Sequence, residues 1–114
     1  VKANALIYPS VWAANGDNEG GIGTVLLEAQ VVGTPIVSTY HADLPYGLAS
    51  VPGIYLTTER SVDGLVARLR QALVEQVRVD GRFVRERHDV QKEVVRLEEK
   101  YQMLLNRRRN VVVA

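Results

Sequence analysis

The sequence contains no cysteine, no long apolar run and almost no net charge. The absence of cysteine excludes a disulfide scaffold and thiolate metal sites, and it fits a cytoplasmic protein. No apolar stretch has the length that a membrane-spanning helix needs, and the first residues do not follow the pattern of a signal peptide. A formal net charge of +1 argues against a nucleic-acid partner, because such domains carry an excess of basic residues.

The length and composition of the chain indicate one small globular domain. The 114 residues are 46% hydrophobic and 24% charged, which suits a single domain of ordinary composition and is too short for two. The chain begins at Val1, and its single methionine is Met103. Because natural chains normally start with methionine, we expect this one to be a truncated or processed product.

Short apolar segments alternate with helical patterns along the chain. Strands are expected at residues 5–8, 35–39 and 53–57, where apolar residues are bounded by loop formers. Helices are expected at 24–32, after a cap at Ser61, at 82–87 and after a cap at Asp89. Strands separated by helices predict parallel pairing with right-handed crossovers. The expected fold class is therefore α/β, a partial Rossmann-like parallel sheet with flanking helices.

Two loops are expected at the carboxyl edge of this sheet, where parallel sheets bind ligands beside helix amino termini. They span residues 10–23 and 40–51. The first contains Gly20-Gly21-Ile22-Gly23, whose backbone could approach a ligand closely and whose amides could attract phosphate. The alternative is a flexible connector. The loop lacks the Lys-Ser/Thr of a P-loop, and Leu26 is too large for the third glycine of a dinucleotide fingerprint.

Glu28 is the only charged residue of the expected helix at 24–32. Because this helix is apolar nearly all round, we expect it to be buried and Glu28 to have partners. Helical side chains lean toward the amino terminus, so the carboxylate should point to the ligand edge, where it could accept both hydroxyls of a ribose. The alternative is that Glu28 only caps backbone amides or pairs with a core arginine.

Several segments, taken in order, form a more specific pattern than any one of them. They are Tyr8-Pro9-Ser10, Glu19 to Ala29, Gly33 to Thr39, Gly81 to Val84 and Glu86 to Asp89. This order resembles the C-terminal nucleotide-sugar-binding domain of family 4 glycosyltransferases, which have the GT-B fold, and it covers nearly the whole chain. The resemblance implies retaining transfer of a sugar from a UDP-, GDP- or ADP-sugar, with no cofactor and no essential metal.

The resemblance also implies roles for individual residues. Glu28 matches the second glutamate of the family's pair, which holds the ribose, and Glu19 is the candidate for the first, which contacts the donor sugar. The family separates the pair by seven residues, whereas eight lie between Glu19 and Glu28, and the strict register falls on Gly20. Either the loop carries one extra residue and Glu19 still reaches the sugar, or that contact is lost. The remaining substrate-binding candidates are Gly20, Gly21, Ile22, Gly23, Thr24 and Val25. Of these, Gly23, Thr24 and Val25 at the helix start are expected to face the diphosphate.

Other residues have two interpretations. His41 and Asp43 lie on the second loop, where they could touch the donor or stabilise a turn through an Asx hydrogen bond. Trp12 could stack on a base or pack. The arginines at 107–109 suit the negative end of a helix dipole, with a membrane-surface contact as the alternative.

The sequence leaves three classes of function. The first is the donor half of a glycosyltransferase that needs an N-terminal Rossmann-like domain as its partner and is inactive alone. The second is a non-catalytic module that binds a nucleotide or nucleotide-sugar. The third, a dinucleotide-binding domain, fits poorly because more than ten residues separate the first strand from the glycine loop.

Overall fold

The computed structural model describes residues 3–18, 21–48 and 50–109. Within these ranges, three parallel strands alternate with helices, in the spatial order β1-β2-β3. The elements are β1 (Leu6–Tyr8), α1 (Thr24–Val32), β2 (Ile36–Thr39), α2 (Leu44–Leu48), β3 (Ile54–Thr57), α3 (Val62–Glu75), α4 (Arg82–Arg87) and α5 (Val90–Arg109). The expected α/β class, with a parallel sheet and flanking helices, is confirmed.

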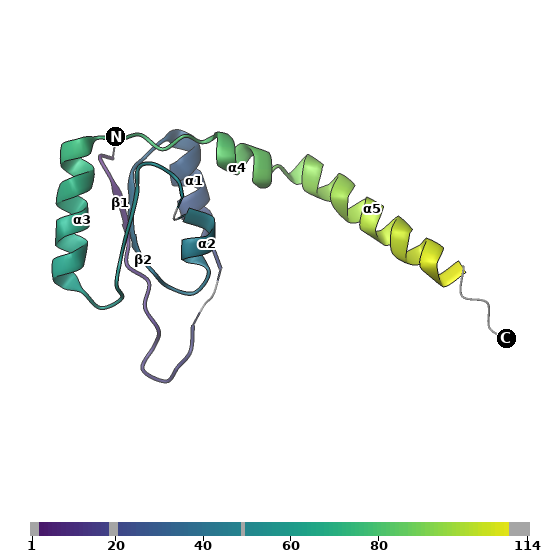
Figure 1. Cartoon of the computed structure of the whole chain (residues 1–114), viewed down its shortest axis with the longest axis horizontal. Helices are drawn as coiled ribbons and strands as arrows, with labels where there is room; N and C mark the ends of the chain where they lie inside the picture. The colour runs from purple at the N-terminus through teal and green to yellow at the C-terminus, as the bar shows by residue number, and fades with distance from the viewer. Residues whose placement is uncertain (1–2, 19–20, 49, 110–114) are drawn as a thin grey trace.

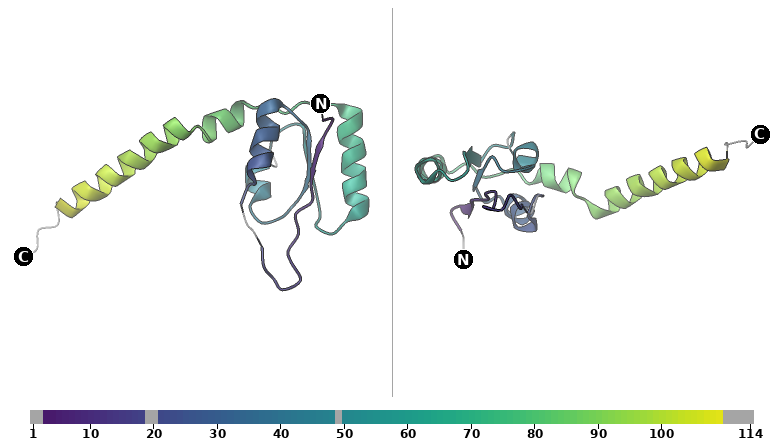
Figure 2. Two further views of the ribbon diagram at one scale, coloured as in Figure 1. Left: turned by 180° about the vertical axis from the view of Figure 1, so that it is seen from behind. Right: turned by 90° about the horizontal axis from the view of Figure 1, so that it is seen from below.

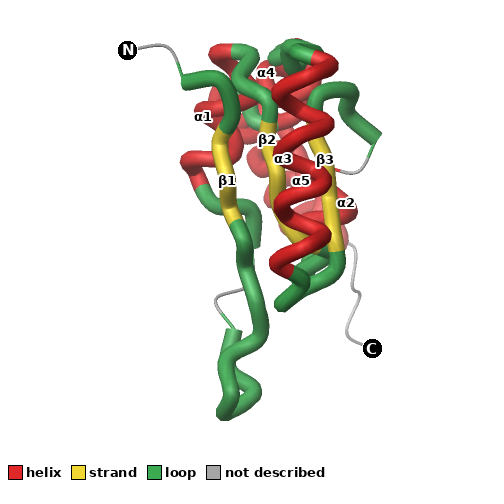
Figure 3. Tube along the Cα trace, turned by 90° about the vertical axis from the view of Figure 1, so that its left-hand side faces the viewer, coloured by secondary structure: helices red, strands yellow, loops and turns green. Residues whose placement is uncertain are grey.

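Side chains of the central strand β2 pack on both faces of the sheet. Ile36 pairs with Leu6 and Ile54, and the next residue, Val37, pairs with Ile7 and Tyr55. Since successive side chains of a strand point to opposite faces, Ile36 packs with α1 and α2, while Val37 packs with α3. Figure 1 shows α3 on one side of the sheet and α1 and α2 on the other, and in Figure 3 the sheet is seen from the side that α3 covers, with α3 in front of the strands.

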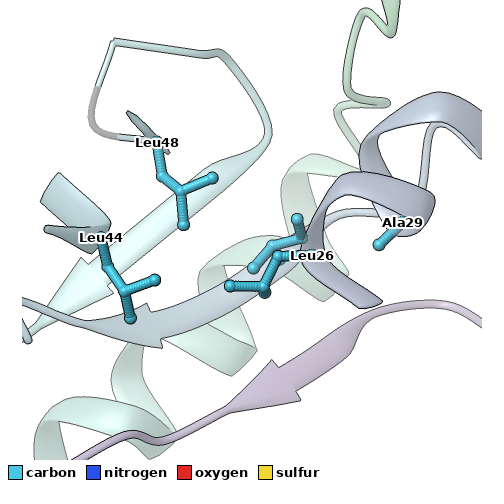
Figure 4. Close-up of a cluster of buried hydrophobic side chains, with 5 residues drawn as sticks. Leu26, Ala29, Leu44 and Leu48 are labelled. Atoms are coloured by element: carbon cyan, nitrogen blue, oxygen red, sulfur yellow. The ribbon is translucent and has the colours of Figure 1, made fainter. Parts of the chain in front are cut away.

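Leucines from two helices form the larger hydrophobic core. Leu26 of α1 and Leu44 and Leu48 of α2 are almost completely buried, and they converge on the sheet with Ala29 (Figure 4). The helix α2 was not expected, because its residues were assigned to a loop. Its leucines are four residues apart, so one helical turn directs both into the core, and that burial fixes an element too short to form alone.

The helix α3 covers the second face. The expected cap is confirmed, since the Ser61 side chain accepts a hydrogen bond from the Gly64 amide at 3.0 Å. Leucines recur every four residues along this helix, at 65, 69 and 73, which predicts that all three face the sheet. Leu65 and Leu69 do pack toward the sheet, but the next buried position is Ala72, while Leu73 is 44% exposed. The helical period of about 3.6 residues explains the difference, because a strict spacing of four drifts off the buried face.

The last helix, α5, projects away from the sheet. Asp89 accepts hydrogen bonds from the amides of Gln91 and Lys92, which confirms the expected cap. No residue of α5 is buried, and the molecule measures 66 × 35 × 23 Å because the helix extends outward (Figures 1 and 2). Among the described residues, no helix combines the length and apolar character needed to span a bilayer.

Candidate functional site

Loops from all three strands meet at the carboxyl edge of the sheet. The loop after β1 is joined to the loop after β2 by a hydrogen bond from the Gly21 amide to the Asp43 carboxylate, at 2.9 Å. It is joined to the loop after β3 by a hydrogen bond from the Trp12 amide to Glu59, at 3.1 Å. Two of the candidate residues, Glu19 and Gly20, lie outside the described residues. The others can be placed individually.

The glycine loop approaches the core closely on its way into α1. Gly21 has a φ of +117°, a conformation that side chains rarely adopt. Ile22 packs against the core, and a Cβ on Gly23 would lie 2.9 Å from the Tyr8 hydroxyl. Gly23 therefore has a packing reason as well as a possible ligand-binding one. Thr24 and Val25 are exposed at the start of the helix.

The amino terminus of α1 keeps its positive character. Gly23 is the N-cap residue and provides no side-chain hydrogen bond, and the first turn contains no acidic residue. Free amide groups at a helix start carry a partial positive charge that favours an anion. Thr24 and Val25 thus lie where a phosphate could be received, beside the glycine loop.

The expectation that α1 and its glutamate are buried is wrong. Glu28 is exposed, and neither a hydrogen bond nor an ion pair links its carboxylate to another described residue. Leu26, Ala29 and Gln30 are the buried residues of the helix. Glu28 follows Leu26 by two positions, which turns it about 200° around the helix, toward the opposite side. Because the sheet covers only one side of α1, an apolar residue such as Val32 is also left 64% exposed.

Asp43 does not form the Asx turn that was one of its two interpretations. Its carboxylate instead accepts the hydrogen bond from the Gly21 amide, across 22 positions of the sequence. The preceding residue, Ala42, has a φ of +46°, a left-handed conformation that favours glycine. The second loop therefore bends sharply before Asp43, and the carboxylate lies against the glycine loop rather than against its own backbone.

His41 is buried in a cluster that ties the three loops together. Its Nδ1 lies 2.7 Å from Glu59 Oε1, and the Trp12 ring packs edge-on against the imidazole with centroids 5.4 Å apart. Arg60 donates a hydrogen bond to the Trp12 carbonyl at 2.6 Å. The hydrogen bond with His41 is the main reason that the pKa of Glu59 is lowered, and the Trp12 amide acts in the same direction.

Sequence reasoning missed Glu59 and Arg60. Both follow β3, the third strand to end at the ligand edge, whereas only the loops after the first two strands were singled out. The signal was available in principle, because every parallel strand of such a sheet delivers its following loop to the same edge. The contacts of Glu59 with His41 and Trp12, which lie 18 and 47 positions earlier in the chain, could not be deduced from local patterns.

Comparison with known proteins finds similarity to bacterial glycosyltransferases. Over 69 residues, or 60% of the chain, it is 36% identical to a candidate colanic acid biosynthesis glycosyltransferase of Salmonella typhimurium. The corresponding Escherichia coli protein is 39% identical over 67 residues, 59% of the chain, and the amylovoran biosynthesis glycosyltransferase of Erwinia amylovora is 37% identical over 68 residues, 60% of the chain. These matches support a glycosyltransferase relationship.

The matched region is a small part of each relative. It spans 17% of the Salmonella protein and 16% of each of the other two. No protein-family model matches the chain, and no solved structure matches it.

Proposed function

We propose that this chain is the donor-binding part of a retaining glycosyltransferase of the GT-B class, and that it binds a UDP-, GDP- or ADP-sugar. The observation that carries the proposal is the placement of Gly21–Gly23 and the uncapped start of α1 at the carboxyl edge of a parallel sheet. The similarity to glycosyltransferases supports a nucleotide-sugar as the ligand of that edge. A phosphate-bearing ligand suits the free amides at the start of α1.

Each part of the donor has a proposed partner. The backbone of residues 20–25 receives the diphosphate, where it stabilises the negative charge that grows as the nucleotide departs. The Glu28 carboxylate accepts hydrogen bonds from the ribose hydroxyls, and its exposure leaves it available for this. Glu19 contacts the transferred sugar. No metal ion or cofactor enters this scheme.

The acceptor is held elsewhere in this proposal. A second Rossmann-like domain completes the cleft and binds the acceptor, so the present chain binds donor without transferring its sugar. Restoring such a domain from a relative and measuring transfer distinguishes a transferase part from a non-catalytic binding module. Robust transfer by a monomer of the present chain would contradict this division of labour.

Calorimetry on the present chain tests the donor site directly. The ligands are UDP, GDP and ADP, their glucose conjugates, and NAD as the competing class. We expect one nucleoside diphosphate and its sugar to bind better than NAD. A preference for NAD, or no binding by any of these ligands to the folded chain, would overturn the proposal.

A further inference from the structure

A cleft of about 370 Å³ opens beside the glycine loop, at the carboxyl edge of the sheet. Its polar lining consists of Tyr8, Ser10, Asp17, Asn18 and His41. Ligand pockets usually span ~300–1,000 Å³, so this cleft has room for one ring rather than a whole nucleotide-sugar. Neither Glu28 nor any residue of Gly21–Val25 lines it, although the family resemblance implies a ligand-binding role for them.

The imidazole of His41, which lines this cleft, is fixed by contacts on two sides. The residue is only 5% exposed, its Nδ1 is paired with Glu59, and the Trp12 ring packs against it. The opposite ring nitrogen, Nε2, hydrogen-bonds with no described residue. The hydrogen bond from the Trp12 amide to Glu59 already joins the loop after β1 to the loop after β3, so the imidazole is not needed for that connection. A fixed imidazole whose Nε2 has no partner among the described residues, at a residue that lines a cleft, is available to hydrogen-bond with a ligand.

The other polar groups favour a ligand with several hydroxyls. The Asn18 Oδ1 is buried without a hydrogen-bond partner in the described structure, and Asp17 also lines the cleft. Carboxylate and amide oxygens accept hydrogen bonds, as does the neutral imidazole nitrogen. Neither lysine nor arginine lines the cleft, and the Asp17 charge would repel a phosphate.

We propose that this cleft binds a monosaccharide unit, that the Nε2 of His41 hydrogen-bonds to one of its hydroxyls, and that Glu59 is the positioning residue for His41. The choice of a sugar rests on the proposed function. The unit belongs either to the donor or to the acceptor, and both present the same ring hydroxyls. In either case, Asp17 and Asn18 accept hydrogen bonds from further hydroxyls, and Glu59 acts only through the imidazole.

Saturation-transfer NMR on the full chain tests the site with free D-glucose, D-galactose and D-mannose. At least one sugar should receive saturation from the protein, and the effect should fall at least fivefold in His41→Phe and in Asn18→Ala. Glu59→Gln should weaken the effect less. The oxygen of the new side chain can still accept a hydrogen bond from the Trp12 backbone amide, although the side chain holds the imidazole less firmly. Val74→Ala, on the exposed side of α3, is the matched control and should leave the effect unchanged.

Titration with nucleotides separates this inference from the proposed function. Bare UDP, GDP and ADP should bind equally well to the native chain and to the two cleft variants, His41→Phe and Asn18→Ala. If the donor sugar occupies the cleft, the variants lower the affinity for the nucleotide-sugar to that of the bare nucleotide. If an acceptor sugar does, that affinity is unchanged, and free sugar still binds in the presence of saturating donor. No sugar signal from the native chain, or an equal signal from both folded variants, overturns the site while nucleotide binding stands.

Discussion

Asp43 and Gly21 are joined by a 2.9 Å hydrogen bond from the Gly21 backbone amide to the Asp43 carboxylate. The Asp43 carboxylate is negatively charged, and it occupies a backbone amide of the loop that is proposed to receive the diphosphate. The chain thus places its own anion where a ligand anion would be recognised. A bound diphosphate must either displace this carboxylate or lie beside it, and in both cases the like charges oppose binding.

Replacing this charge should therefore strengthen nucleotide binding. Asp43→Asn keeps an oxygen that can accept from the Gly21 amide but removes the negative charge. We expect the affinity for the preferred nucleoside diphosphate to rise on the order of fivefold, which corresponds to about 1 kcal/mol for a like charge at an exposed site. Calorimetry at low and high salt measures the effect, which should shrink as salt screens it. Glu98→Gln on α5 is the control, and an unchanged or weaker affinity in folded Asp43→Asn contradicts the idea.

Glu28 should matter for binding and not for folding. Because its side chain is exposed and bonded to no other described residue, Glu28→Gln should change the free energy of unfolding by less than about 0.5 kcal/mol. Loss of hydrogen bonds between the charged carboxylate and the ribose should weaken nucleotide binding by roughly 1.5–3 kcal/mol. Urea unfolding and calorimetry on the same samples measure both quantities. An unchanged affinity would remove the ribose role.

The position of Glu19 gives a test that distinguishes two registers of the loop. If the loop carries one extra residue and Glu19 reaches the sugar, Glu19→Ala should lower the affinity for the nucleotide-sugar and leave the affinity for the bare nucleotide as it was. If the strict register holds, both affinities should stay unchanged. Equal loss for both ligands would contradict both versions and would indicate an effect on the phosphate side or on folding.

The unexpected helix α2 should contribute strongly to stability. Leu48 is fully buried between α2 and the sheet, so Leu48→Ala should lower the free energy of unfolding by about 2–5 kcal/mol. Leu73→Ala makes the same chemical change at a position that is 44% exposed and should cost less. Urea denaturation compares the two variants. Equal losses would show that the α2 leucines are not packed as the structure has them.

Tyr55 should make stability depend on pH in the alkaline range. Burial raises its pKa from 10.0 to about 12, and its hydroxyl, 2.7 Å from Glu75, adds to the shift. Since the folded pKa lies above the unfolded one, this contribution is fully present below pH 10.0 and is lost as pH rises toward about 12. Tyr55→Phe should flatten the unfolding free energy over that range. Ultraviolet titration of the native chain checks the cause, and titration of all five tyrosines in one step near their ordinary value would contradict it.

Local patterns predicted much of the fold. Each strand was expected within about a residue of its observed start, because a short apolar run bounded by loop formers needs no distant information. The caps at Ser61 and Asp89 were also correct, since a cap bonds to amides only two or three residues away. The alternation of strands and helices sufficed to indicate a parallel sheet, and with it the edge to which the glycine loop is delivered.

Tertiary structure decided what no local pattern contains. Periodicity gave α1 no preferred face, so only the packing of the sheet against Leu26 left Glu28 exposed. The cluster of Trp12, His41 and Glu59 and the bond between Gly21 and Asp43 join segments that are 18 to 47 positions apart. These contacts exist because three parallel strands end at one edge and bring their loops within hydrogen-bonding distance. The sequence by itself determined which groups reach that edge, and the folded sheet decided which of them meet.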